Sequence, residues 1–210
     1  MYKSIHGTHK IGRYWLNIEN LTERSHCTTC DKDKTMEHIL TGCPANIRST
    51  VWTEANDIWP YDNDLWPQIT PGIILGCGLL EIRSKNQPPN QNHDKHTNEP
   101  TVNTGATRLA KILISEAAYL IWMLCCGRVI SDKTYTADAI KTMWRRMLNR
   151  RLAEDITAAT KIVRKEEHTK MVHHTWYAAL KKKYKDLLED WMKLQPHFQK
   201  ATNPNLKQHQ

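Results

Sequence analysis

Four residues within one short stretch, Cys27, Cys30, His38 and Cys43, constrain this chain more than any other feature. Three thiols and one imidazole at this spacing are typical of closed tetrahedral zinc sites. The two residues between Cys27 and Cys30 predict a tight turn that directs both sulfurs toward one metal ion. Residues 36–40 predict a short helical turn that presents His38. Because four protein ligands leave no open position, the sequence predicts a structural zinc site rather than a catalytic one.

Other interpretations of these residues stay open at this stage. The four residues can be reduced cysteines and a surface histidine that share no metal. Alternatively, Cys27 and Cys30 can be a redox pair, although the strand-then-helix pattern of such sites does not surround them. His26 is a competing ligand, but neighbours in sequence rarely reach one metal with good geometry. A segment this short buries little apolar surface. Metal binding worth roughly 10–16 kcal/mol in comparable peptides would then supply its folding energy.

The remaining sequence predicts an all-α fold, an irregular helical domain with a small N-terminal CCHC zinc knuckle. Apolar residues at helical spacing predict helices over residues 44–59, 105–130, 137–165 and 167–194. Ile11, Tyr14, Trp15 and Ile18 predict one face of a further, basic helix before the metal ligands. The short apolar element at 71–80 favours helix, and no stretch shows the alternation of a strand.

The chain divides by composition into four regions. Residues 1–83 form the predicted zinc-knuckle region with flanking helices, and residues 84–104, rich in Asn, Gln, Pro and His, predict a disordered linker. Residues 105–195 form a helical C-terminal region, and 196–210 predict a frayed tail. Glu116 falls inside the apolar face of the longest predicted helix. A buried carboxylate needs a partner, so we expect an arginine from a neighbouring helix in preference to a catalytic role.

The formal net charge of +8 favours an anionic partner, and nucleic acid is the usual candidate. Basic residues gather before and within the metal-ligand stretch and on the predicted helix at 137–165. The residues that we select for nucleic-acid contact are Lys10, Arg13, Arg24, Lys141, Arg145, Arg146 and Arg150. Solvated charges on helices that simply pack into the core are the competing explanation for both groups.

Several classes of function lack their motifs in this chain. The acidic residues are scattered, so no converging carboxylates suggest a two-metal nuclease, and there is no glycine-rich phosphate loop, Gly-x-Ser-x-Gly or His-Glu-x-x-His. We therefore expect no independent enzymatic activity. No signal peptide opens the chain and no apolar run suggests a membrane span. We expect reduced cysteines, a nuclear or cytoplasmic location and no membrane partner.

Three sequence words carry a resemblance to a known family: residues 5–15 (IHGTHKIGRYW), 23–30 (ERSHCTTC) and 36–44 (MEHILTGCP). They resemble the reverse-transcriptase zinc-binding segment of LINE-type (non-LTR) retrotransposon polyproteins. Residues 74–79 (ILGCGL) and 115–122 (SEAAYLIW), followed by residues 128–130, resemble the helical extension of fungal members. The resemblance covers roughly residues 1–150, and it implies Cys27, Cys30, His38 and Cys43 as zinc ligands.

The resemblance implies a nucleic-acid-associated module of a mobile element that helps to engage template RNA or target DNA. The polymerase aspartates and ribonuclease H carboxylates of such polyproteins are absent here. We therefore expect a non-enzymatic, zinc-binding and nucleic-acid-binding accessory region, whose binding is electrostatic and largely independent of sequence. The alternatives are a scaffold that packs on other domains of a retroelement polyprotein and a truncated relic without a retained role.

Overall fold

A computed structural model describes residues 8–84, 101–161, 165–184 and 192 of the chain. Helices account for 72% of the described residues and strands for 3%, which confirms the prediction of a mainly helical chain. The predicted tail at 196–210 and most of the predicted linker lie outside the described residues.

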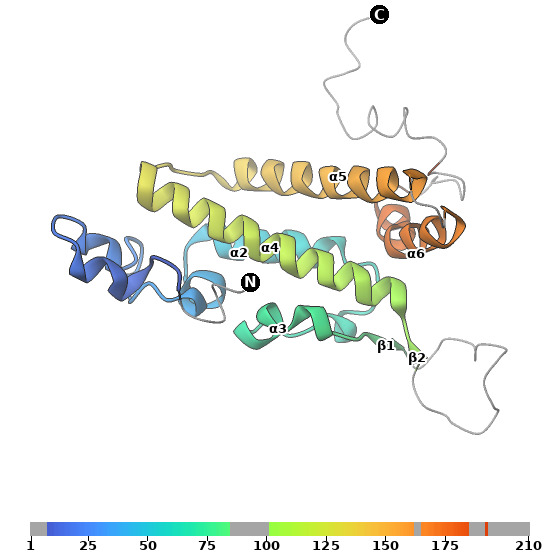
Figure 1. Cartoon of the computed structure of the whole chain (residues 1–210), viewed down its shortest axis with the longest axis horizontal. Coiled ribbons are helices and arrows are strands. Elements are labelled where there is room, and N and C mark those ends of the chain that lie inside the picture. Colours follow the sequence, from blue (N-terminus) through green and yellow to red (C-terminus); the bar gives the residue numbers. More distant parts are fainter. Residues whose placement is uncertain (1–7, 85–100, 162–164, 185–191, 193–210) are drawn as a thin grey trace, which may run out of the picture.

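The longest helix, α4 (Thr104–Ser131), lies at the centre of the fold (Figure 1). It begins where the Asn103 side chain accepts a hydrogen bond from the Ala106 backbone N–H at 2.9 Å, the usual way to satisfy a free donor at a helix start. It ends at Asp132, whose left-handed backbone (φ 47°) stops the helix. Every residue of the predicted apolar stripe is buried: Leu109, Ile112, Leu113, Ala117, Leu120, Ile121 and Leu124.

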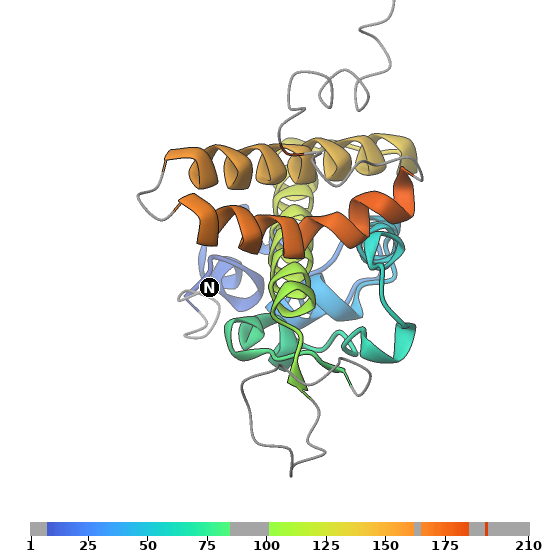
Figure 2. The ribbon, with the colours of Figure 1, turned by 90° about the vertical axis from the view of Figure 1, so that its right-hand side faces the viewer.

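Four further helices surround α4. They are α2 (Asn46–Ile58), the short α3 (Pro71–Leu75), α5 (Ala137–Lys161) and α6 (Lys165–Lys183). Each contacts α4, and α2 and α6 also pack against α5. Figure 2 shows α4 nearly end-on beneath the layer formed by α5 and α6. One cluster of buried apolar side chains therefore unites residues on both sides of the predicted linker.

The helix termini follow local capping chemistry. Thr136 precedes α5, and its hydroxyl accepts a hydrogen bond from the Ala139 N–H at 3.2 Å. Thr70 caps α3 in the same way, with Pro71 in the first turn. The predicted start of α2 at Pro44 is wrong by two residues, because the helix begins at Asn46.

Two sequence-based expectations are wrong: the absence of strands and the α-helix before the metal ligands. Strand β1 (Arg83–Ser84) pairs in antiparallel fashion with β2 (Thr101–Val102), so the ends of the predicted linker form a small ladder. Two-residue strands are too short to show an alternating pattern in the sequence. The predicted N-terminal α-helix is instead a 3₁₀-helix, η1 (Gly12–Asn17), followed by a second, η2 (Thr22–Ser25).

Contrary to the expectation that no apolar run suggests a membrane span, α4 is long and apolar enough to cross a membrane by length and composition alone. However, 56% of its most apolar window is buried inside the protein, as in the core helix of a globular fold.

An ion pair with a buried carboxylate, between Arg108 and Asp155, joins three helices. Both guanidinium nitrogens of Arg108 on α4 donate to the Asp155 carboxylate on α5, each at 2.8 Å. The Trp176 indole of α6 donates to the same carboxylate at 2.8 Å, and Arg108 also donates to the Thr175 hydroxyl. Because each oxygen of this carboxylate accepts a charge-assisted bond, Asp155 is tolerated with only 6% of its surface exposed.

Glu116 is half-buried rather than fully buried. Burial raises the pKa of its carboxyl group, while the positive charges of Arg151 and Arg150 on α5 oppose that rise. The expected arginines from a neighbouring helix are therefore close, but neither forms an ion pair with Glu116 within the described residues. Arg151 instead approaches Asp155, at 3.7 Å.

We predict that Asp155→Ala lowers the free energy of unfolding by roughly 3–5 kcal/mol, because it leaves Arg108 and the Trp176 indole without their acceptor. Chemical denaturation measures the change. Glu154→Ala is a matched control, since Glu154 is exposed and its ion pair with Arg150 contributes less than about 1 kcal/mol. Equal effects of the two substitutions would contradict the structural role of the buried pair.

We also predict that Gly105→Ala destabilises the protein by about 1–3 kcal/mol, although alanine normally favours a helix. A Cβ atom at Gly105 would lie 2.9 Å from the carbonyl carbon of His174 on α6 and nearer still to its oxygen, so the two helices would have to separate. Gly72→Ala in α3 is the control, because the nearest atom to its Cβ lies at 3.7 Å. Thermal unfolding of both variants provides the measurement, and an unchanged midpoint for Gly105→Ala would refute the close packing.

Candidate metal centre

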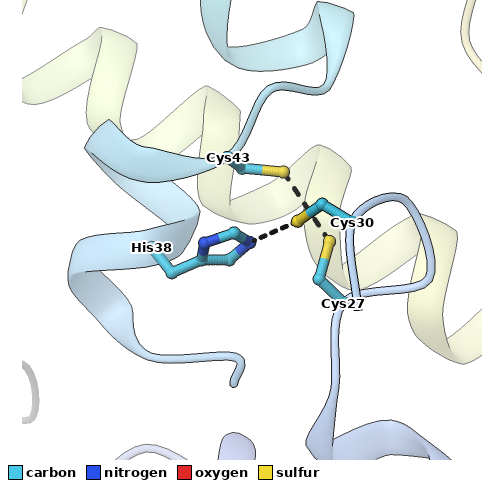
Figure 3. Close-up of side chains that lie close together, drawn as sticks. All are labelled: Cys27, Cys30, His38 and Cys43. Atoms are coloured by element: carbon cyan, nitrogen blue, oxygen red, sulfur yellow. Dashed lines mark hydrogen bonds between the residues drawn. The ribbon is translucent and has the colours of Figure 1, made fainter. Parts of the chain in front are cut away.

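The first two candidate ligands lie on a tight loop after η2. The Cys27 N–H donates to the Lys32 carbonyl at 2.9 Å, and the Asp31 N–H donates to the Cys27 carbonyl at 2.8 Å. Asp31 adopts a left-handed backbone (φ 54°), which aspartate tolerates better than most residues. This turn places the sulfurs of Cys27 and Cys30 on the same side of the loop (Figure 3).

The other two candidate ligands lie at the two ends of a short π-helix, η3 (His38–Gly42). His38 is its first residue, and Cys43 directly follows its last. The π-helix begins where the Thr35 hydroxyl accepts a hydrogen bond from the His38 N–H at 3.0 Å. It ends where the Cys43 N–H donates to the His38 carbonyl at 2.6 Å. The wider turn brings His38 and Cys43 to one side, and the Trp52 indole of α2 holds the element by donating to the Leu40 carbonyl at 2.9 Å. The predicted helical turn is confirmed, but its π geometry is not visible in the sequence.

The four predicted ligands come together in space. Their nearest donor atoms all lie within 4.8 Å of one another. The Cys27 and Cys43 sulfurs are 3.7 Å apart, and the Cys30 sulfur lies 3.4 Å from Nε2 of His38 (Figure 3). Cys27, Cys43 and His38 are buried and Cys30 is half-buried. Three sulfurs and one ring nitrogen thus form a group that can hold a metal ion.

The environment favours the thiolate form of one cysteine. Burial raises the pKa of Cys27, but hydrogen bonds from the His38 side chain, the Thr29 backbone and the neighbouring thiols lower it to about 6. Burial raises the pKa of Cys43. These opposite shifts favour the thiolate form of Cys27 and the thiol form of Cys43.

The competing ligand and the other cysteines lie outside this group. Nε2 of His26 pairs with Asp33 at 3.2 Å, and its Nδ1 is 2.8 Å from the Ser25 hydroxyl. Cys77 and Cys125 are buried in the main apolar core, whereas Cys126 is half-buried.

Two of the three N-terminal residues selected for nucleic-acid contact, Lys10 and Arg24, lie over aromatic rings. The Lys10 ammonium is 5.6 Å from the centre of the Tyr14 ring, and the Arg24 guanidinium is 5.4 Å from that of Trp15. Tyr14 and Trp15 meet edge to face, with ring centres 5.2 Å apart. We call Lys10, Tyr14, Trp15 and Arg24 the basic–aromatic cluster. Arg13 is exposed on the same 3₁₀-helix, and Tyr14 keeps 41% of its surface exposed.

The four selected residues on α5 do not present one unpaired basic face. Lys141 pairs with Glu54 of α2 at 3.5 Å, and Arg150 pairs with Glu154 at 3.6 Å. Arg145 and Arg146 are exposed and form no ion pair within the described part of the chain. Half of the positive charge predicted for this surface is therefore already neutralised by carboxylates of the protein.

Two cations beside the sulfurs are not marked by any sequence pattern. Lys34 is 3% exposed, and Arg128 of α4 reaches the loop at Thr29 and Cys27. Arg128 lies in the last turn of a helix, where a basic residue is common, so its position alone does not suggest a contact with the metal ligands.

The burial of Asp155, in contrast, could have been predicted from the sequence. Asp155 lies on the same helix face as the apolar residues Leu152, Ile156 and Ala159.

Comparisons of the chain with protein-family models, with curated proteins and with solved structures found no match. The assignment of the four ligands therefore depends on their chemistry and geometry.

We predict that the full chain binds one divalent metal ion. Cys30→Ser should weaken the affinity by more than about 100-fold, because losing a metal ligand costs more than losing a residue that only hydrogen-bonds to a ligand. Native mass spectrometry and chelator competition measure stoichiometry and affinity. Cys126→Ser is the matched control, since Cys126 is also half-buried but lies outside the ligand group. Equal affinity of the two variants would exclude Cys30 as a ligand.

Proposed function

We propose that this chain is a non-enzymatic, zinc-binding and nucleic-acid-binding accessory region of a retrotransposon-derived reverse transcriptase polyprotein. The observation that carries the proposal is the Cys₃His group with the basic–aromatic cluster next to it in the same segment. The likeness of residues 1–150 to the reverse-transcriptase zinc-binding segment supports the polyprotein origin.

Two of the six donor–donor distances within the Cys₃His group match a zinc tetrahedron, and all six are within 4.8 Å. With Zn–S near 2.3 Å and Zn–N near 2.0–2.1 Å, a regular tetrahedron has sulfur–sulfur edges of about 3.8 Å and sulfur–nitrogen edges of about 3.6 Å. The corresponding distances between Cys27 and Cys43 and between Cys30 and His38 are 3.7 and 3.4 Å. Thiolate and imidazole ligands also suit zinc better than the hard cations Mg²⁺ and Ca²⁺. Zinc in this set would have four protein ligands and a structural role.

The basic–aromatic cluster supports nucleic acid as the partner. Positive charges attract the phosphate backbone without reading sequence, and exposed aromatic rings stack on unpaired bases. Arg24 lies only three residues before Cys27, so metal binding and this surface belong to one local structure. Tyr14, with 41% of its surface exposed, offers a ring face for a base. We favour single-stranded over duplex nucleic acid for this reason.

We predict that the zinc-loaded chain binds single-stranded RNA with an affinity that falls steeply with salt concentration. Arg13→Gln should reduce the slope of the logarithm of the binding constant against the logarithm of the salt concentration by about 0.7, the value for one phosphate contact on a single strand. Fluorescence anisotropy at several salt concentrations gives the slope.

Arg83→Gln is the matched control for this measurement, because Arg83 is also exposed but is paired with Glu81 far along the chain from the cluster. The slope of this variant should equal that of the unchanged protein. Absence of RNA and DNA binding at low salt by a zinc-loaded chain would overturn the nucleic-acid part of the proposal.

A protein-interaction scaffold is the second candidate, and one surface favours it. Tyr119, Met123 and Ile130 lie on α4 with 54%, 42% and 60% of their surface exposed. They share a face of the helix at spacings of four and seven residues. In a longer polyprotein this apolar stripe would pack on another domain. Concentration-dependent self-association that Met123→Lys abolishes, together with no nucleic-acid binding, would favour the scaffold.

A further inference from the structure

Two cations, the buried Lys34 and the half-buried Arg128, converge on the Cys₃His group from different parts of the chain. A third cation, Arg48 of α2, lies beside them and donates to the Cys43 carbonyl. A small cavity of about 10 Å³ lies against this group, and its lining includes Cys27, His38 and Cys43 together with Lys34 and Arg128. Lys34 comes from the segment between the ligands, and Arg128 comes from the end of α4. The guanidinium of Arg128 donates to the Thr29 hydroxyl at 2.8 Å and to the Cys27 sulfur at 3.8 Å.

These cations have no carboxylate partner. Neither Lys34 nor Arg128 belongs to an ion pair within the described residues. Nζ of Lys34 and Nε of Arg128 are buried atoms without a hydrogen-bond partner there. A buried ammonium group without a counter-charge is strongly unfavourable in a protein interior. The arrangement therefore favours negative charge nearby. The thiols that line the same cavity, Cys27 and Cys43 of the Cys₃His group and Cys125 of α4, can supply it.

Metal binding would generate that negative charge. A divalent ion contributes +2, three thiolates contribute −3 and the neutral imidazole contributes nothing, so the loaded centre carries −1. Hydrogen bonds and positive charge from outer residues stabilise thiolate ligands and orient them toward the ion. The cavity places both cations where they can act in this way.

We propose that Lys34 and Arg128 are positioning residues that supply the counter-charge of the loaded metal centre and raise its affinity for zinc. The inference depends on the proposed zinc site and goes beyond it, because it assigns a role in metal binding to residues that do not touch the ion. A favourable interaction of Arg128 with the negative end of α4 is the simpler explanation of that residue. It does not account for the direction of the guanidinium, which reaches residues 99 and 101 positions away in the chain.

Chelator competition with zinc on the full chain tests this inference. Lys34→Met and Arg128→Met should each weaken zinc binding by about 10–100-fold, the usual effect of removing an outer partner. Arg128→Lys, which keeps the charge and loses the planar fork, should weaken it less than Arg128→Met. Lys133→Met removes an exposed cation near the end of the same helix and should leave the affinity unchanged.

A stability measurement separates this role from a general structural one. With chelator present, Lys34→Met should be at least as stable as the unchanged protein, because the substitution removes a buried charge without a partner. With zinc present, it should be less stable. A merely structural lysine would lower both stabilities by the same amount.

The outcomes distinguish the two proposals. If the unchanged chain binds one zinc ion and both methionine variants bind within twofold of it, the counter-charge role is wrong and the zinc site stands. If the unchanged chain binds no zinc, both proposals fall. If Lys34→Met does not fold, the two Arg128 variants and Lys133→Met still decide the question.

Discussion

The burial of α4 is the constraint on which the fold depends. A helix with apolar residues on most of its circumference is stable only when other elements cover it, because each Å² of exposed apolar surface costs about 25 cal/mol. Helices α2, α3, α5 and α6 provide that cover, and the Arg108–Asp155 pair ties three of the helices at one end. The carbonyl group of His174 beside Gly105 shows how closely α6 approaches α4.

The metal-ligand segment is stabilised by different interactions. The small buried cluster around the ligands consists of Cys27, Cys43 and Ala45, with Cys30 packed against it. Its apolar surface is mostly that of the candidate ligands themselves, so it offers little hydrophobic stabilisation without coordination. Ile39 and Leu40 of η3, in contrast, belong to the main core. The segment is therefore anchored to the helices at η3, whereas its outer loop is held by polar contacts such as those between Cys27 and Lys32 and between Cys27 and Asp31.

Local periodicity and spacing predicted much of this structure. The apolar stripe of α4, the Thr136 cap and the convergence of the four ligands all follow from chemistry that is local in sequence. The three-residue spacing of Ile11 and Tyr14 could not distinguish an α-helix from the 3₁₀-helix that forms, since both place residues three apart on nearby faces. The π geometry after His38 and the two-residue strands likewise leave no periodic signal.

Electrostatic contacts between residues far apart in the chain could not be predicted from sequence patterns. Lys141 was selected for nucleic-acid contact, yet it pairs with Glu54, and this pairing depends on how α2 packs against α5. The same holds for Arg128, whose contact with Thr29 joins residues 99 positions apart.

The contact between Arg128 and the loop at Thr29 also affects how fragments of the protein would behave. A cut within residues 84–104 yields an N-terminal piece that keeps all four sulfur and nitrogen donors but loses Arg128, which donates to the Cys27 sulfur at 3.8 Å. Metal affinities of such a piece would therefore not represent those of the intact chain.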